Sequence, residues 1–315
     1  MFNILAPIFG LIALAYASRK VNILGPSAYI ELNRFVASLA LPALLFDNVA
    51  HVTPAQLRQP GFLAAFALGA LVVFAVPLLF GREERAFGDR ALDGLSACYP
   101  NTGYIGLPLA FLAFGPPSAP GSTIAAVFTA CVLFAMAIAL LEWNLHRGHA
   151  VGVAALKVGS SLARNPILLA PILALTVTMG LWEMPAWADR VVKLLAGSAG
   201  PCALVAHGLF LARDDPSNTK LWVLATRPRP LALVTLKLVA QPLITALLAV
   251  YAFGLTGMDA QLVVILSALP TGTGAFMLAD VYKRDLAVTS TTIMASTIAS
   301  AVTLSLCLAV LPRVL

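Results

Sequence analysis

The stretch that decides the fold is Tyr99-Pro100-Asn101-Thr102-Gly103-Tyr104-Ile105-Gly106-Leu107-Pro108. It lies inside an apolar run at about 91–113, which is long enough for a membrane-spanning helix. Each proline removes a backbone donor and clashes with the preceding turn, and each glycine costs a helix about 1 kcal/mol relative to alanine. The stretch therefore predicts a helix that unwinds near the middle of the membrane.

A second stretch of the same kind is Leu269-Pro270-Thr271-Gly272-Thr273-Gly274-Ala275, inside the apolar run at about 260–282. A half-helix that starts at such a break exposes N–H groups backed by about half a positive charge. This suits an anion without any Lys or Arg, and the glycines would let a ligand approach the backbone. We expect the two broken helices to cross near the midplane and to hold a carboxylate. A pair of ordinary proline kinks without a ligand is the alternative.

The composition places the whole chain in a membrane. Of 315 residues, 60% are hydrophobic and 11% charged, against about 45–50% and 25% in soluble domains. This excludes a cytosolic enzyme, a disordered protein and a nucleic-acid binder. Apolar runs bounded by charges or Gly/Pro turns fall at about 3–17, 28–46, 61–80, 91–113, 122–143, 165–182, 187–212, 229–253, 260–282 and 286–311. They predict an all-α polytopic membrane protein with ten transmembrane helices.

The basic residues predict the orientation. Connections on one side of these ten spans hold fourteen of the twenty Lys and Arg residues, those on the other side hold four, and two lie in or near spans. Positive loops favour the cytoplasmic side. We therefore expect both termini on the outer side of the bacterial inner membrane, and we attribute the net charge of +6 to topology and not to a nucleic-acid partner.

The two halves of the chain contain short matching sequences in the same order. Matches in the same order join Leu5-Ala6-Pro7-Ile8 to Leu169-Ala170-Pro171-Ile172, Pro42 to Pro201, Leu95-Ser96-Ala97 to Leu266-Ser267-Ala268, and Pro100 to Pro270. They predict two five-helix repeats, 1–150 and 151–315. Because five is odd, the second repeat must be inverted relative to the first, as in many secondary transporters.

Polar residues within the spans are the candidates for a site. For substrate binding we select Asn101, Thr102, Gly103, Tyr104, Thr271, Gly272, Thr273, Gly274 and His207, with Pro100 and Pro270 marking the breaks. His207 could instead be a neutral histidine bonded between helices. For coupling or gating we select Asp280, Asp47 and Gln241, although both acids could simply lie at the membrane interfaces. We expect Lys237 to extend toward the inner interface.

No cofactor or enzymatic motif is present in the sequence. Cys98, Cys131, Cys202 and Cys307 lie apart in apolar runs and suggest neither disulfides nor a metal site. There is no phosphate-binding loop and no H-E-x-x-H motif. We expect no enzyme activity, no cofactor and no metal.

At these motifs the chain resembles the auxin efflux carrier family of permeases. The matching features are Leu-Pro-Ala-Leu-Leu-Phe at 41–46, the Pro-Asn-Thr-Gly-Tyr-Ile-Gly-Leu-Pro stretch at 100–108, Arg164-Asn165-Pro166, Gly-Pro-Cys-Ala-Leu at 200–204, and Leu-Pro-Thr-Gly at 269–272 followed by Phe276, Ala279 and Tyr282. The resemblance covers essentially the whole chain and is closest to the compact bacterial members.

The resemblance implies the crossover fold shared with bile-acid symporters and NhaA-type antiporters. Spans 1, 2, 6 and 7 would form a scaffold and homodimer face, and spans 3–5 and 8–10 a transport domain that moves like an elevator. Asn101 would contact the carboxylate of a small organic anion, such as an auxin-like monocarboxylate, malonate or malate. Coupling to Na⁺ or H⁺, or a membrane sensor that binds ligand without transport, are the alternatives. The implied partners are the anion, lipid and one of these ions.

Overall fold

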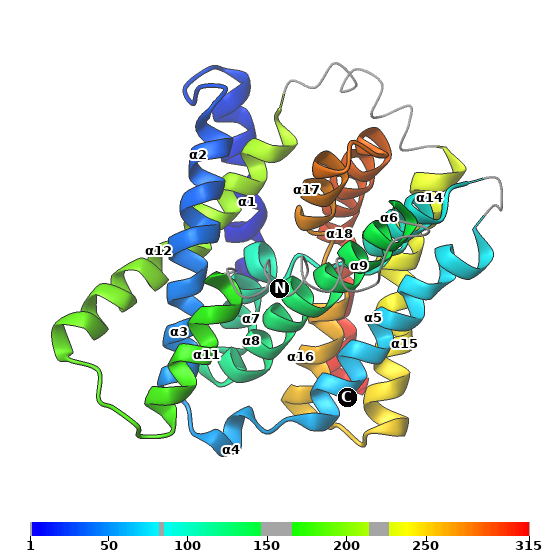
Figure 1. The fold of residues 1–315 in the computed structure, drawn as a ribbon. Coiled ribbons are helices and arrows are strands. Elements are labelled where there is room, and N and C mark those ends of the chain that lie inside the picture. The colour runs from blue at the N-terminus through cyan, green and yellow to red at the C-terminus, as the bar shows by residue number, and fades with distance from the viewer. Residues whose placement is uncertain (1, 82–84, 146–165, 214–226, 315) are drawn as a thin grey trace. The chain divides into compact units, whose positions relative to one another are not determined.

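The computed structural model describes residues 2–81, 85–145, 166–213 and 227–314, and within these ranges every regular element is a helix (Figure 1). The contacts divide the chain into two compact units. Unit 1 comprises Met1–Pro60, Thr102–Val127 and Arg164–Asp214, and unit 2 comprises Gly61–Asn101, Phe128–Ala163 and Asp215–Leu315. The predicted repeat boundary at 150 lies outside the described residues.

Unit 1 is built around two pairs of packed helices. Its elements are α1 (Phe2–Lys20), α2 (Ala28–Phe35), η1 (Val36–Ala40), α3 (Leu41–Ala50), α4 (Pro54–Leu57), η2 (Thr102–Gly106), α7 (Leu107–Phe114), η3 (Pro116–Ser118), α8 (Ala119–Val127), α11 (Pro166–Thr178) and α12 (Ala186–Leu211). Helix α1 packs along α12, and α3 packs against α11 and α12. At Gly208 a Cβ would collide with the Ile12 carbonyl, so α1 and α12 approach backbone to backbone.

Unit 2 contains the remaining helices. Its elements are α5 (Pro60–Phe80), α6 (Phe87–Cys98), η4 (Phe128–Leu133), α9 (Phe134–Leu145), α14 (Pro228–Thr235), η5 (Leu236–Ala240), α15 (Gln241–Leu247), η6 (Leu248–Ala252), α16 (Gly257–Ser267), α17 (Gly274–Val281) and α18 (Leu286–Val314). Helix α6 packs against α9, α14 against α18, and α15 against α16. Gly69 of α5 contacts Thr245 of α15 so closely that a Cβ would not fit.

Among the described residues, six helical stretches are long and apolar enough to cross a membrane: 28–50, 54–80, 116–143, 186–211, 228–252 and 286–313. Three shorter apolar helices lie at 102–114, 169–178 and 257–267. Two of the predicted ten spans, at about 91–113 and 260–282, are divided into pieces, and that at about 165–182 is described as the 13-residue helix α11. The chain is a multi-pass helical protein, and its ten-span, two-repeat arrangement stays a prediction.

Proline shapes several of these helices. Pro42, Pro108 and Pro242 each occupy the second position of an α-helix that follows a five-residue π-turn, namely η1, η2 and η5. A proline ring clashes with the carbonyl four residues earlier in a regular α-helix. The wider i→i+5 turn moves that carbonyl away, and such turns are frequent at functional sites.

Candidate functional site

Helical structure is interrupted at both proline–glycine stretches, as the sequence predicts. Helix α6 ends at Cys98 and η2 begins at Thr102, while α16 ends at Ser267 and α17 begins at Gly274. The non-helical residues between them are largely buried, and Asn101, for example, is only 3% exposed. Buried non-helical backbone must find hydrogen-bond partners elsewhere in the protein.

The two interruptions bind one another directly. The Asn101 N–H donates to the Pro270 carbonyl at 2.9 Å, and the Gly272 N–H donates to the Tyr99 carbonyl at 2.9 Å. These bonds form a short antiparallel bridge centred on Pro100 and Thr271. Because proline has no N–H, the donors are the N–H groups of Asn101 and Gly272, while Pro270 takes part through its carbonyl.

The Tyr99 side chain explains why positions 272 and 274 must be glycine. A Cβ on Gly272 would lie 3.0 Å from the Tyr99 ring and 3.2 Å from the Asn101 Cα, and a Cβ on Gly274 would lie 2.6 Å from the Tyr99 Oη. The ring also packs at a tilt against Phe134, with 6.3 Å between centroids. We selected these glycines for close approach of a ligand, whereas in the structure the face they leave open is covered by Tyr99.

Side chains of unit 2 satisfy the carbonyl ends of both interrupted helices. Gln241 Nε2 donates to the Cys98 carbonyl, the last of α6, at 3.0 Å. Lys237 Nζ donates to the Ser267 carbonyl, the last of α16, at 2.6 Å. Lys237 is fully buried, so the expectation that it extends to the inner interface is wrong. Its amino group instead supplies a hydrogen-bond donor to the C-terminus of α16 inside the protein.

Thr271 makes two further hydrogen bonds at the second interruption. Its Oγ1 donates to the Ser96 carbonyl at 2.8 Å, and its N–H donates to Ser296 Oγ at 3.1 Å. Within the described ranges, by contrast, no hydrogen bond is found from the N–H groups of Thr273 and Gly274, where α17 starts. The last carbonyls of α6 and α16 therefore have hydrogen-bond donors. The N–H groups at the start of α17 keep the positive partial charge of a helix N-terminus.

The predicted binding residues divide between the two units. Unit 2 holds Pro100, Asn101, Pro270, Thr271, Gly272, Thr273, Gly274 and Gln241, and unit 1 holds Thr102, Gly103, Tyr104 and His207. Tyr104 Oη donates to Asn33 Oδ1 at 2.6 Å. His207 is fully buried and stacks on Phe210, with 6.3 Å between centroids and 14° between planes.

The predicted coupling residue Asp280 lies at an exposed position. Its side chain is 52% exposed, and its Oδ1 accepts from Lys283 Nζ at 2.8 Å. This is the pairing expected of an interface carboxylate, which was the alternative considered for it.

Asp47 belongs to a cluster that sequence reasoning missed. His51 Nδ1 lies 3.1 Å from Asp47 Oδ1, and His51 Nε2 lies 3.1 Å from Asp189 Oδ1. Asp189 in turn bonds Lys193 at 2.8 Å. Asp47, His51 and Asp189 are close enough to hold a metal ion, whereas the sequence suggested no metal site. Their juxtaposition depends on α3 packing against α12, which no local motif signals.

A second missed cluster joins four charged residues of unit 2. Arg229 Nη2 donates to Asp93 Oδ1 at 2.6 Å, and Arg229 Nη1 donates to Asp285 Oδ1 at 3.2 Å. Arg85 bonds both of these carboxylates. Partial burial by itself would raise the pKa of Asp285, but Arg229 and Arg85 outweigh it and hold that pKa below its ordinary value. Asp93, an acid within an apolar run, was the available sequence signal.

Comparison with known proteins shows which family of proteins the chain resembles. The sequence model of a family described as "Membrane transport protein" matches residues 1–308. A Rhizobium meliloti protein named "Putative malonate transporter" is 28% identical over 96% of this chain and 93% of its own length. An uncharacterized transporter of Methanothermobacter thermautotrophicus is 24% identical, covering 94% and 93%, and the uncharacterized transporter YfdV of Escherichia coli K12 is 25% identical, covering 89% and 88%. The chain is therefore similar to membrane transporters.

Proposed function

We propose that this chain, which belongs to the membrane transport protein family (the auxin efflux carriers), moves a small organic anion across the bacterial inner membrane by alternating access. The observation that carries the proposal is the paired interruption. Two buried non-helical segments meet at Pro100 and Thr271, and their carbonyl ends are compensated. In secondary transporters, the N-termini of discontinuous helices commonly face anionic substrate groups.

The carboxylate would bind at the start of α17, with Asn101 beside it. The α17 N-terminus supplies positive partial charge, and the Thr273 hydroxyl supplies a neutral donor and acceptor at a site only 4% exposed. Asn101 lies within reach of this segment, because its Cα is 3.2 Å from where a Gly272 Cβ would stand. The amide of Asn101 can donate to a carboxylate without adding charge.

A small carboxylate is the substrate class that these groups favour. The relative from Rhizobium meliloti carries malonate in its name, and malonate, malate and an auxin-like monocarboxylate are the candidates we propose to test. Apolar residues of α17 itself, such as Phe276, would suit the body of the anion.

Transport driven by the membrane potential alone is the energetic scheme we favour over coupling to Na⁺ or H⁺. In ion-coupled carriers, carbonyls at interrupted helices commonly hold the cation. Here Lys237 and Gln241 already occupy the final carbonyls of α16 and α6. Export of an anion from a negative interior is favourable by about 2.3 kcal/mol per charge per 100 mV.

For the movement we propose an elevator in which spans 3–5 and 8–10 carry the substrate and spans 1, 2, 6 and 7 form a dimeric scaffold. Unit 1 contains α1, α3, α11 and α12, and unit 2 contains α5, α6 and α14–α18. The contact grouping also places Thr102–Val127, from spans 4 and 5, in unit 1. The moving body must therefore either include that segment or bend at Asn101 and Phe128.

The test is flux into proteoliposomes at a set membrane potential. Labelled malonate, malate and indole-3-acetate are offered with and without Na⁺ and pH gradients, to wild type, Asn101→Ala and a control, Asn48→Ala. Asn48 is an amide in unit 1 that bonds Thr123 at 3.1 Å. We expect saturable flux that Asn101→Ala abolishes and Asn48→Ala retains.

Three other outcomes separate the alternatives. Flux unaffected by Asn101→Ala would refute the site and leave the carrier. Specific binding without flux would indicate a sensor. Flux that requires a Na⁺ or pH gradient at zero potential would replace the potential-driven scheme by a coupled one.

A further inference from the structure

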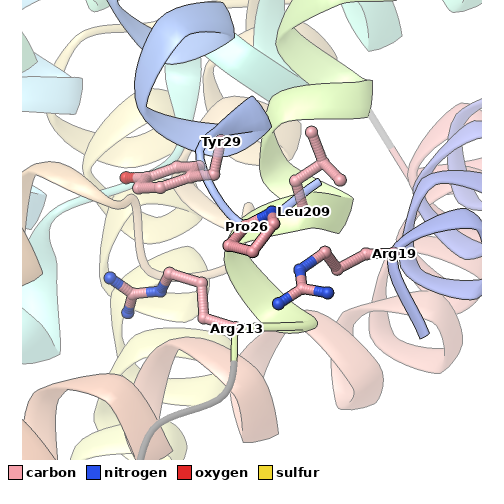
Figure 2. Close-up of a pocket in the computed structure, with 5 residues that line it drawn as sticks. All are labelled: Arg19, Pro26, Tyr29, Leu209 and Arg213. Atoms are coloured by element: carbon pink, nitrogen blue, oxygen red, sulfur yellow. The ribbon is translucent and has the colours of Figure 1, made fainter. Parts of the chain in front are cut away.

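A cavity of about 420 Å³ lies in unit 1 where α1 and α12 end, remote in sequence from both interruptions. It is lined by Arg19, Pro26, Tyr29, Leu209 and Arg213. Figure 2 shows Pro26 between the side chains of Arg19 and Arg213, with the Tyr29 ring on the Arg213 side. We propose that this cavity binds a phosphate-bearing anion, either the headgroup of an anionic lipid or a soluble phosphate compound.

Among the described residues, the lining combines two permanent positive charges with a hydroxyl and contains no acidic side chain. Guanidinium groups match the geometry of phosphate oxygens and remain charged at any physiological pH. The Tyr29 phenol can donate a further hydrogen bond. Pro26 and Leu209 add apolar surface, which suits the carbon skeleton attached to the phosphate.

Arg213 is held in position by two aromatic rings. Its guanidinium carbon lies 4.0 Å from the centroid of Phe210 and 5.3 Å from that of Tyr29. The two rings are themselves 5.6 Å apart and tilted by 59°. The Arg213 Nε donates to the Phe210 carbonyl at 3.2 Å. Stacking and this bond restrict the plane of the guanidinium, so little side-chain entropy is lost when an anion binds.

Arg19 is brought to the same place by the turn that ends α1. Asn22 adopts a left-handed conformation with φ of 58°. The Ile23 N–H donates to the Ser18 carbonyl at 2.9 Å and the Asn22 N–H to the Arg19 carbonyl at 3.1 Å, which is a Schellman ending. The chain then reverses into Pro26 and α2. Arg19 Nη1 also donates to Asn22 Oδ1 at 3.2 Å, so the turn orients the arginine that lines the cavity.

The location favours a headgroup or phosphate on the cytoplasmic side. On the orientation predicted from the charge count, Arg19 and Arg213 lie at the inner surface, where basic pockets between helices bind anionic lipids. The competing explanation is that both arginines only neutralise the C-termini of α1 and α12. That explanation predicts no ligand, whereas a hollow lined by both cations predicts one.

The experiment measures binding to purified protein and needs no transport activity, so its result is independent of the proposed function. Wild-type protein in detergent is titrated with short-chain phosphatidylglycerol, short-chain phosphatidylcholine, inorganic phosphate and glycerol 3-phosphate. Each surface arginine contributes roughly fivefold to anion binding, so we expect Arg19→Gln/Arg213→Gln to lose roughly 30-fold in affinity. Lys20→Gln, on the same last turn of α1 but outside the lining, should change affinity by less than about twofold.

The four titrated compounds distinguish a lipid headgroup from a soluble phosphate as the ligand. Binding of phosphatidylglycerol but not of the soluble phosphates indicates a lipid headgroup, and binding of the soluble phosphates indicates a free ligand. Arg213→Lys keeps the positive charge but loses the paired N–H donors of the guanidinium. It should fold and bind with intermediate affinity. Equal loss with Lys20→Gln, or no arginine-dependent binding of any of these anions, overturns the proposal. Asp214 and Asp215 follow Arg213 and lie outside the described residues, so Asp214→Asn/Asp215→Asn is included and should not weaken binding.

Discussion

Replacing Gly274 by alanine tests whether Tyr99 must lie against the start of α17. The added Cβ would stand 2.6 Å from Tyr99 Oη and 2.8 Å from Cε1 and Cζ of the same ring, at least 0.6 Å closer than the 3.4 Å at which ordinary van der Waals contact begins. Because Phe134 packs against the ring, the ring cannot move without disturbing its neighbours. Overpacking of this size costs about 1–3 kcal/mol, and moving Tyr99 also strains the bridge to Gly272.

The matched control is Gly197→Ala in α12, where nothing lies within 4 Å of the new Cβ. Alanine in an open helical position stabilises by roughly 0.5–1 kcal/mol. Thermal unfolding in detergent should therefore shift in opposite directions, with Gly274→Ala lowering Tm and Gly197→Ala raising it slightly. In proteoliposomes only Gly274→Ala should lose flux. An unchanged Tm and full flux for Gly274→Ala would refute the packing argument.

Three further changes test the contacts around the interruptions and the charged cluster. Gln241→Leu should lower the free energy of unfolding by about 1 kcal/mol, because the Cys98 carbonyl loses its donor while the unpaired Gln241 Oε1 is also removed; a stabilised variant would contradict this. Asp93→Asn should cost about 2–3 kcal/mol in thermal or denaturant unfolding, since it leaves two partly buried arginines with one carboxylate, whereas Glu31→Gln in an exposed pair should cost under about 0.5 kcal/mol. The lowered pKa of Asp285 contributes stability above its unfolded value near 3.9 that is lost as pH falls through the folded pKa, so Asp285→Asn should flatten the Tm profile at acidic pH, and an identical profile would refute the linkage.

Local chemistry was enough to predict where the helices break. Proline and glycine act on their own turn, so Pro100 and Pro270 signal an interruption in any surrounding structure. The same locality explains why the partners were missed. Gln241 and Cys98 meet only because the chain returns to that place after more than a hundred residues, and no periodicity records such a return.

Long polar side chains were the least predictable from sequence. A lysine in an apolar run normally extends to the interface, and Lys237 fails that expectation because a π-turn and the end of α16 offer it a carbonyl inside the protein. Asp280 shows the opposite case, since an exposed lysine three residues away gives it the simple pairing considered for it. The position of each side chain depends on whether a backbone carbonyl or a side-chain partner lies within hydrogen-bonding distance.

The arrangement at the interruptions has a consequence for energy coupling. An unwound helix in a membrane presents two kinds of unsatisfied group, carbonyls that attract cations and amides that attract anions. Here the final carbonyls are taken by Lys237 and Gln241, while within the described ranges the amides at Thr273 and Gly274 have no hydrogen-bonded partner. On the proposed function, an anionic substrate would bind at these amides, and no co-transported cation would be needed at the carbonyls that Lys237 and Gln241 occupy.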